Sequence, residues 1–386
     1  MVTSNIKNPF LHSNNREYQI CNYCLMDTSD PEIHFNEIGR CNHCIEISKP
    51  DPEINKARYQ YLQKEFSKIV YKIKQDGKNK PYDCVIGISG GVDSSYVAYL
   101  VKELGLRPLA VHLDNGWNAE LAVQNIHTIL SKLDIELYTH VLDWEEFKDL
   151  QLSFLKASTP DSEIPSDHAI FAINYEIANK YGIKYFINGG NRQTESIMPR
   201  IWSQGHNDWT YIESIHKQFG SKKLSNYPHY SWHKMQWYRN ISGIKWINIL
   251  EYYDYKKLEV VDMLKQDLGW VPYSTKHGES IYTKFFQEYI LPVKFNADKR
   301  RAHLSNLITN GELSRQEALD KLEKEKTSES EIQSDREFVI KKLGISSDIF
   351  EQIMESPPKT IYDYHNSTFS SFYQNLQTQF NKVLSF

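Results

Sequence analysis

Short apolar runs alternate with amphipathic segments along the middle of the chain. The run DCVIGI at 83–88 is followed by a glycine-rich loop and then by a segment with one apolar helical face. That face consists of Val97, Leu100, Val101 and Leu104. Further apolar runs and helical segments alternate at 106–114, 119–133, 135–143, 166–182, 183–190 and 245–255. This alternation predicts an α/β fold, a parallel sheet with helices on both faces and ligands at the carboxyl ends of the strands.

The last third of the chain has a helical pattern instead. Residues 303–322 indicate two helices joined by a glycine-containing turn, with Ser314 and Glu317 spaced as a capping box. A further short helix is expected before Pro357 and Pro358. We therefore expect three domains: a cysteine-rich segment 1–55, an α/β domain 56–272 and a helical substrate or partner region 273–386.

An aromatic, polar insertion occupies about residues 191–245 of the α/β domain. Aromatic rings can form a wall that binds a sugar, and they can equally form a lid that packs on the core. The pattern leaves both interpretations open. Its tryptophans are Trp202, Trp209, Trp232 and Trp237.

Four of the five cysteines follow the spacing of a four-thiolate metal site. Two C-x-x-C pairs are separated by 16 residues, and two such turns can place four sulfurs around one ion. A closed site of this kind has no open position, so we expect structural zinc, although spacing alone does not distinguish zinc from iron. The ligands are Cys21, Cys24, Cys41 and Cys44. The fifth cysteine, Cys84, lies within an apolar run and is expected to be a buried hydrophobic residue.

The loop SGGVDSS follows the first predicted strand and begins a helix. Backbone N–H groups and the helix dipole at such a position favour an anion, and the two glycines allow a phosphate to approach. The loop lacks the lysine that is typical of phosphate-binding loops for γ-phosphoryl transfer. Asp93 is suited to Mg²⁺, and the serines can donate hydrogen bonds. The expected ligands of the phosphates are Ser89, Gly90, Gly91, Asp93, Ser94 and Ser95.

The net charge and the hydropathy of the chain limit the classes of partner and the location that we expect. The chain has 45 basic and 49 acidic side chains, a net charge of −4, so a broad nucleic-acid surface is not expected. The same charge argues against a DNA-binding role for the helical pair at 303–322. No apolar run is long enough to span a membrane and no signal-like segment opens the chain, which favours a cytoplasmic protein.

The SGGVDSS loop resembles the pyrophosphate-binding loop of the PP-loop ATP pyrophosphatases, whose signature is S-G-G-x-D-S. The resemblance implies cleavage of ATP between the α- and β-phosphates, with ATP and Mg²⁺ as cofactors. Two further loops are similar to the nucleotide-contacting loops of that superfamily, although the Thr–Glu order in the second is reversed and its usual paired aspartates are absent. These loops contribute Asp114, Gly189, Gly190, Asn191, Thr194 and Glu195.

Most of the chain, about 20–365, resembles the N-acetyl sugar amidotransferases of bacterial surface polysaccharide and nonulosonic acid synthesis. The cysteine pairs, the SGGVDSS loop and the block 276–322 carry this resemblance. It implies that ATP activates the acetamido oxygen of an N-acetylated, nucleotide-linked sugar and that ammonia then displaces AMP. The chain shows no glutaminase site, so ammonia would come from a separate subunit similar to the glutaminase of imidazole glycerol phosphate synthase, with a cyclase-like subunit as a possible conduit.

The block 276–322 supplies candidate catalytic residues. A cation near the α-phosphorus would stabilise the charge that develops there, and a histidine could transfer a proton. A solvated turn and an ordinary surface charge run are the alternative interpretations. The candidates, which join Asp93, are Lys276, His277, Glu279 and Arg300, the last within a basic run 299–301 that could clamp phosphates.

Two other functions remain as alternatives. A tRNA thiolase or a lysidine-type ligase also combines a PP-loop with cysteine pairs, but Cys84 is the one cysteine left for sulfur transfer and no basic surface is evident. The chain could also be a zinc scaffold that no longer turns over ATP, although the intact loop argues against it.

Overall fold

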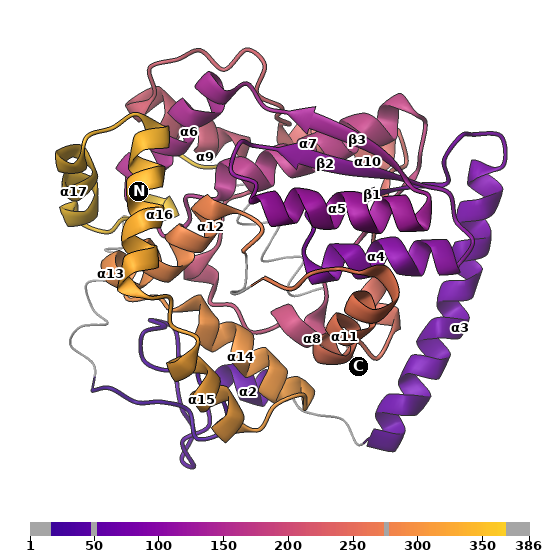
Figure 1. The fold of residues 1–386 in the computed structure, drawn as a ribbon, viewed down its shortest axis with the longest axis horizontal. Coiled ribbons are helices and arrows are strands. Elements are labelled where there is room, and N and C mark those ends of the chain that lie inside the picture. The colour runs from indigo at the N-terminus through magenta and orange to yellow at the C-terminus, as the bar shows by residue number, and fades with distance from the viewer. Residues whose placement is uncertain (1–16, 48–51, 274–277, 368–386) are drawn as a thin grey trace, which may run out of the picture.

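The computed structural model describes residues 17–47, 52–273 and 278–367, and its centre is a five-stranded sheet (Figure 1). All neighbouring strands pair in parallel, and their order is β3-β2-β1-β4-β5. The predicted α/β fold is confirmed. Because the chain moves outward from β1 in both directions, the gap between β1 and β4 is the switch point at which such sheets bind ligands. The strands are β1 (Cys84–Gly87), β2 (Pro108–Asp114), β3 (Glu136–Val141), β4 (Tyr185–Asn188) and β5 (Lys245–Asn248).

Alternate side chains of the strands face two different helical layers. Ile86 and Ile187 pack against one layer, whereas Val85 and Phe186 pack against the other. Strands β1, β2 and β4 are mostly buried on both faces and therefore read as apolar runs, whereas the edge strand β3 is largely exposed. The first layer contains α3 (Pro52–Gly77), α4 (Val92–Glu103), α5 (Glu120–Leu133) and α11 (Lys257–Leu268), and the second contains α7 (Ile164–Lys180) and α10 (Trp232–Asn240).

Two predicted boundaries were wrong. Helix α7 begins before Ser166, because Pro165 fits a first helical turn without needing an N–H partner and Asp161 accepts the N–H of Glu163. The fifth strand is shorter than the apolar run 245–255. After Asn248 the chain forms a 3₁₀ turn with Ile249 fully buried, so the run combines a strand with a buried turn.

The remaining helices pack mainly against one another. The helical pair predicted at 303–322 is confirmed as α14 (Lys299–Asn310) and α15 (Arg315–Lys324), and the Ser314–Glu317 capping box is present. The predicted helix before Pro357 is α17 (Ser347–Glu355). The others are α2 (Asn42–Glu46), α6 (Trp144–Ala157), α8 (Arg192–Glu195), α9 (Trp209–Phe219), α12 (Ile281–Phe285), a π-helical segment (Phe286–Ile290), α13 (Leu291–Phe295) and α16 (Glu329–Leu343). None of the helices in the described ranges is both long enough and apolar enough to cross a membrane.

The aromatic insertion belongs mainly to the core. Trp202 is fully buried, and Trp209 stacks between His168 and His229. These contacts favour the packing interpretation for both side chains. Trp237 is 46% exposed and lines neither of the two cavities described below.

The four cysteines predicted to bind metal form one buried cluster. The sulfur of Cys21 lies 4.0 Å from that of Cys44, and the sulfur of Cys24 lies 3.7 Å from that of Cys41. Four thiolates at about 2.3 Å from one zinc ion would be separated by about 3.8 Å, so the cluster has the dimensions of a tetrahedral site. The N–H groups of Met26 and Cys41 point to these sulfurs, which suits charged thiolates.

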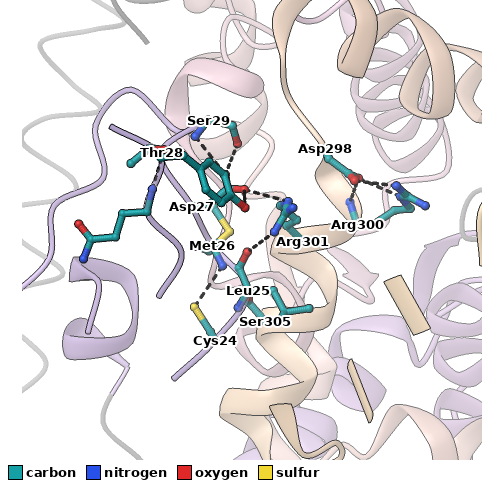
Figure 2. Close-up of polar contacts among 12 residues, drawn as sticks. Cys24, Leu25, Met26, Asp27, Thr28, Ser29, Asp298, Arg300, Arg301 and Ser305 are labelled. Carbon is teal, nitrogen blue, oxygen red and sulfur yellow. Dashed lines mark hydrogen bonds and ion pairs between the residues drawn. The ribbon is translucent and has the colours of Figure 1, made fainter. Parts of the chain in front are cut away.

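The cysteine segment is attached to α14, as Figure 2 shows, and also to α15. Arg301 forms an ion pair with Asp27 at 3.1 Å and donates to the carbonyl of Leu25, while the N–H of Leu25 donates to Ser305. From α15, Arg315 donates to the carbonyls of Cys21 and Cys24. The cluster therefore holds one side of the helical pair.

Replacing Cys24 by Ser should remove the bound metal and loosen α14 and α15. The loss of one ligand opens the site, and structural zinc contributes directly to folding free energy. We expect elemental analysis to find about one zinc per wild-type chain and none per variant chain, with a lower Tm and faster proteolysis at 299–324. Cys84→Ala is the control and should retain its zinc, because Cys84 is buried in β1. A metal-free wild-type protein with an unchanged Tm would contradict the structural role.

Candidate functional site

The SGGVDSS loop turns from β1 into α4. The hydroxyl of Ser89 accepts the N–H of Gly91, and the hydroxyl of Ser94 accepts the N–H of Ser89 and donates to the carbonyl of Gly91. No side chain caps the first turn of α4. Its N–H groups and the positive end of its dipole are therefore directed at a ligand, and an anion is the group that they suit.

Gly90 and Gly189 allow three segments to meet at this point. Gly90 has φ +83°, and a Cβ there would lie 2.7 Å from the carbonyl oxygen of Ala122. A Cβ on Gly189, at the end of β4, would lie 3.2 Å from that of Asp93. The carbonyl of Gly90 accepts hydrogen bonds from the ring N–H of Trp270 and the hydroxyl of Tyr273. The loop is thus fixed from the second half of the chain.

A lysine that the loop itself lacks reaches it from α11. Lys257 Nζ lies 3.5 Å from Asp93 Oδ2, and its side chain is 18% exposed. The hydroxyl of Tyr255 donates to the other oxygen of Asp93, and burial and the Asp93 charge raise the pKa of Tyr255, so that it stays a donor. The sequence analysis missed both residues. The available signal was a tyrosine at the end of the predicted run 245–255 with two lysines after it, although the observed strand β5 already ends at Asn248.

The loop after β4 lies beside the first loop, as predicted. Asn191 caps α8 by accepting from the N–H and the hydroxyl of Thr194, and Gly190 donates to Asn188. Asn191 and Thr194 are both buried. Of this loop, Glu195 lines the larger cavity and Thr194 the smaller.

Two cavities open on the SGGVDSS loop. The larger, of about 550 Å³, is lined by Ser89 and Ser94, by His112 of β2 and by the start of α7. The smaller, of about 340 Å³, is lined by Gly91, Asp93 and Lys257 and by apolar residues of α11 and α14. Four residues of the C-terminal region line both cavities, and they mark where the two meet: Glu279, Gln287, Lys299 and His303.

Several predicted site residues have other roles here. Ser95 is fully buried and lines neither cavity, because it faces inward from α4. The carboxylate of Asp114 accepts from the N–H of Gly116 and the amide of Asn118, so it holds the turn after β2. Lys276 and His277 lie outside the described residues.

The basic run 299–301 does not act as a single clamp. Arg300 lines the smaller cavity but is held by Asp298, at 2.7 and 2.9 Å (Figure 2). Arg301 faces the cysteine cluster. Lys299 is 7% exposed and lies between the cavities, 3.8 Å from Glu163. A helix directs consecutive side chains about 100° apart, which separates three neighbours that look like one patch in the sequence.

Comparisons with known proteins match the two halves of this site to different family models. Residues 62–200 match the model for NAD synthase, and residues 279–377 match the C-terminal domain of WbpG-like LPS biosynthesis proteins. The first match contains the SGGVDSS loop. The second contains all four residues that border both cavities.

Individual relatives are more distant. A tRNA-specific 2-thiouridylase of Fusobacterium nucleatum is 30% identical over 27% of this chain and 32% of its own length. A tRNA(Ile)-lysidine synthase of Chlamydia pneumoniae is 25% identical over 32% of this chain and 36% of its own length. This chain thus spans about a third of the curated relatives that it matches. The solved NH₃-dependent NAD synthetase of Campylobacter jejuni has 16% identity and a TM-score of 0.28, over 42% of this chain and 72% of that one.

The two family models match two segments of this chain, and both segments contribute residues to the same site. The first indicates a PP-loop domain that uses ATP, and the matched residues contain four of the five strands, β1 to β4. The second identifies the helices that close this domain's cavities. Together the matches indicate a PP-loop domain combined with a C-terminal domain similar to that of WbpG-like LPS biosynthesis proteins, as the resemblance in the sequence indicated.

Proposed function

We propose that this protein is an ATP-dependent amidotransferase that converts the acetamido group of an N-acetylated, nucleotide-linked sugar into an acetamidino group for bacterial surface polysaccharide. The observation that carries the proposal is the meeting of two cavities on a pyrophosphate-type loop, with a WbpG-like domain as the closing wall. This arrangement leaves room for ATP and for a second substrate beside its α-phosphate.

The charges suggest how ATP would lie. The β- and γ-phosphates would occupy the smaller cavity, at the N-terminus of α4 and beside Lys257, and adenosine would extend into the larger cavity. Asp93 would hold Mg²⁺ through its carboxylate oxygens. The α-phosphorus then lies where the cavities meet, beside Lys299 and His303. A buried cation there stabilises the charge that develops as pyrophosphate leaves.

Amide oxygen is a poor leaving group, and this explains the use of ATP. In the proposed reaction the acetamido oxygen attacks the α-phosphorus and pyrophosphate departs, which gives an imidate joined to AMP. Ammonia then attacks the imidate carbon and AMP leaves. Glu279 borders both cavities and is placed for proton transfer during these steps.

The partners expected from the sequence remain part of the proposal. A separate glutaminase subunit would supply ammonia, with a cyclase-like subunit as conduit, and the cytoplasmic location stays a prediction. Two relatives act on tRNA by name, but sulfur transfer has little support here. Four cysteines form the cluster and Cys84 is fully buried. The net charge of −4 also disfavours a tRNA surface.

The products of ATP cleavage test the assignment of the loop. With Mg²⁺, an ammonium salt and a panel of N-acetylated nucleotide sugars, we expect AMP and pyrophosphate in equal amounts. A sugar product about one mass unit lighter should form with them. Asp93→Asn should lower this rate by about 100-fold or more, because the metal loses a charged ligand. Formation of ADP would contradict the assignment, and turnover with tRNA alone would favour the alternative.

Replacing Lys257 by Ala should lower kcat by about 100-fold, because the leaving pyrophosphate loses a cation in a partly buried site. Binding of Mg²⁺-pyrophosphate, measured by calorimetry, should weaken as well, and Lys257→Arg should restore part of both. The matched control is Lys256→Ala. Lys256 is adjacent in sequence but donates to the carbonyl of Asn310, away from the loop. Equal losses in both variants would mean that Lys257 only supports the fold.

A further inference from the structure

One end of the larger cavity has an excess of negative charge. Glu163 and Asp167, at the start of α7, line it, and Asp161 lies behind them, 3% exposed and bound by the hydroxyl of Ser203. The cation beside these carboxylates is Lys299, 3.8 Å from Glu163. Within the part of the chain that the structure describes, Lys299 is the cation next to these three carboxylates, so this end of the cavity carries an excess of negative charge.

In the described ranges, two acceptors of the same wall lack donors, whereas Glu163 accepts from the amide of Gln287 at 2.9 Å. Among the residues that the structure describes, no group donates a hydrogen bond to the carboxylate of Asp167. Two turns further along α7, Asn174 is 2% exposed and lines the same cavity. Its amide N–H donates to Ile170, but its Oδ1 has no partner. Buried acceptors normally have donors, so this wall suits a ligand that brings N–H groups.

Burial and neighbouring acidic groups both raise the pKa of these carboxyl groups. Both effects raise the pKa of Asp167 well above its ordinary range, and burial raises the pKa of Asp161 to about 6. Lys299 opposes this rise in both cases. A cation that entered would stabilise the charged carboxylates, and a carboxylate of raised pKa is a better proton acceptor.

We propose that the Asp167–Glu163–Asn174 wall binds the nitrogen nucleophile as ammonium and the acetamidino product as amidinium. This inference rests on the proposed function, which turns a neutral amide into a group that is cationic at neutral pH. A planar amidinium presents N–H groups in the fork geometry that a carboxylate accepts. The diphosphate of the sugar carrier, being anionic, would be kept from this end.

The proton and electron balance of the step is complete with these groups. Ammonium gives one proton to Asp167 and becomes ammonia. Its nitrogen lone pair forms the C–N bond at the imidate carbon, the C–O bond to AMP breaks, and AMP leaves with the electron pair. The three hydrogens of ammonia stay on the two product nitrogens, which share the positive charge. Asp167 then returns its proton to solvent.

The test measures the two halves of the reaction separately, in wild type and in the variant Asp167→Asn. The first half is sugar-dependent exchange between pyrophosphate and ATP without ammonium, and the second is amidine formation when ammonium is added. We expect the first to stay within about threefold of wild type and the second to fall by about 100-fold, with a raised KM for ammonium. The matched control is Glu176→Gln, on the same helix, where Glu176 pairs with Lys234 at 3.2 Å outside the cavity. It should behave as wild type.

Equal losses in both halves, or no loss in either, would overturn the inference. A wild-type protein without sugar-dependent exchange would instead contradict the proposed function. The wall can still be tested then, with acetamidinium chloride as the probe in the presence of AMP. We expect the probe to raise the Tm of wild type and of Glu176→Gln, but not that of Asp167→Asn. An equal response of all three proteins would overturn the assignment of this wall, whichever sugar the enzyme uses.

Discussion

The uncapped N-terminus of α4 is the feature on which the rest of the site depends. Its N–H groups need an acceptor, and among the residues that the structure describes no side-chain cap is present at this helix end. Trp270 and Tyr273 bind the carbonyl of Gly90 and so keep these groups in place. Lys257 adds a charge that the loop does not carry in its own sequence. A phosphate group therefore meets a site that is already arranged, and little reorganisation is needed when charge moves in the reaction.

Helix α14 connects the cysteine cluster with the place where the two cavities meet. One side of it carries Lys299 and His303 to the junction of the cavities, and another carries Arg301 and Ser305 to the cysteine cluster. The amide of Asn306 also binds both backbone groups of Ile197, in the segment after β4. A rigid helix held at three places can position a buried lysine better than a loop can. This gives the buried cysteine cluster a structural role beside the cavities, because it helps to hold α14 in place.

The features that could be predicted from the sequence alone are those formed by residues close together in the chain. The glycine loop, the cysteine pairs and the Ser314 capping box each depend on residues a few positions apart, and each is present. The sequence could not show contacts between distant segments. Asp93 meets Lys257 only because β1 and β5 flank β4, and Glu163 meets Lys299 only after the C-terminal helices close the sheet. For the same reason, the sequence left open whether the basic run at 299–301 is a phosphate clamp or a surface charge run, whereas its three side chains have three different partners.

The order of these parts along the chain has a consequence for synthesis. The loop at Ser89–Ser94 leaves the ribosome early, Lys257 follows much later, and Lys299 later still. A chain that ends before Lys257 lacks the lysine that reaches Asp93, and one that ends before α14 also lacks Lys299 and His303, which line both cavities. Under the proposed function, the groups needed for both substrates would therefore come together only after α14 has been synthesised.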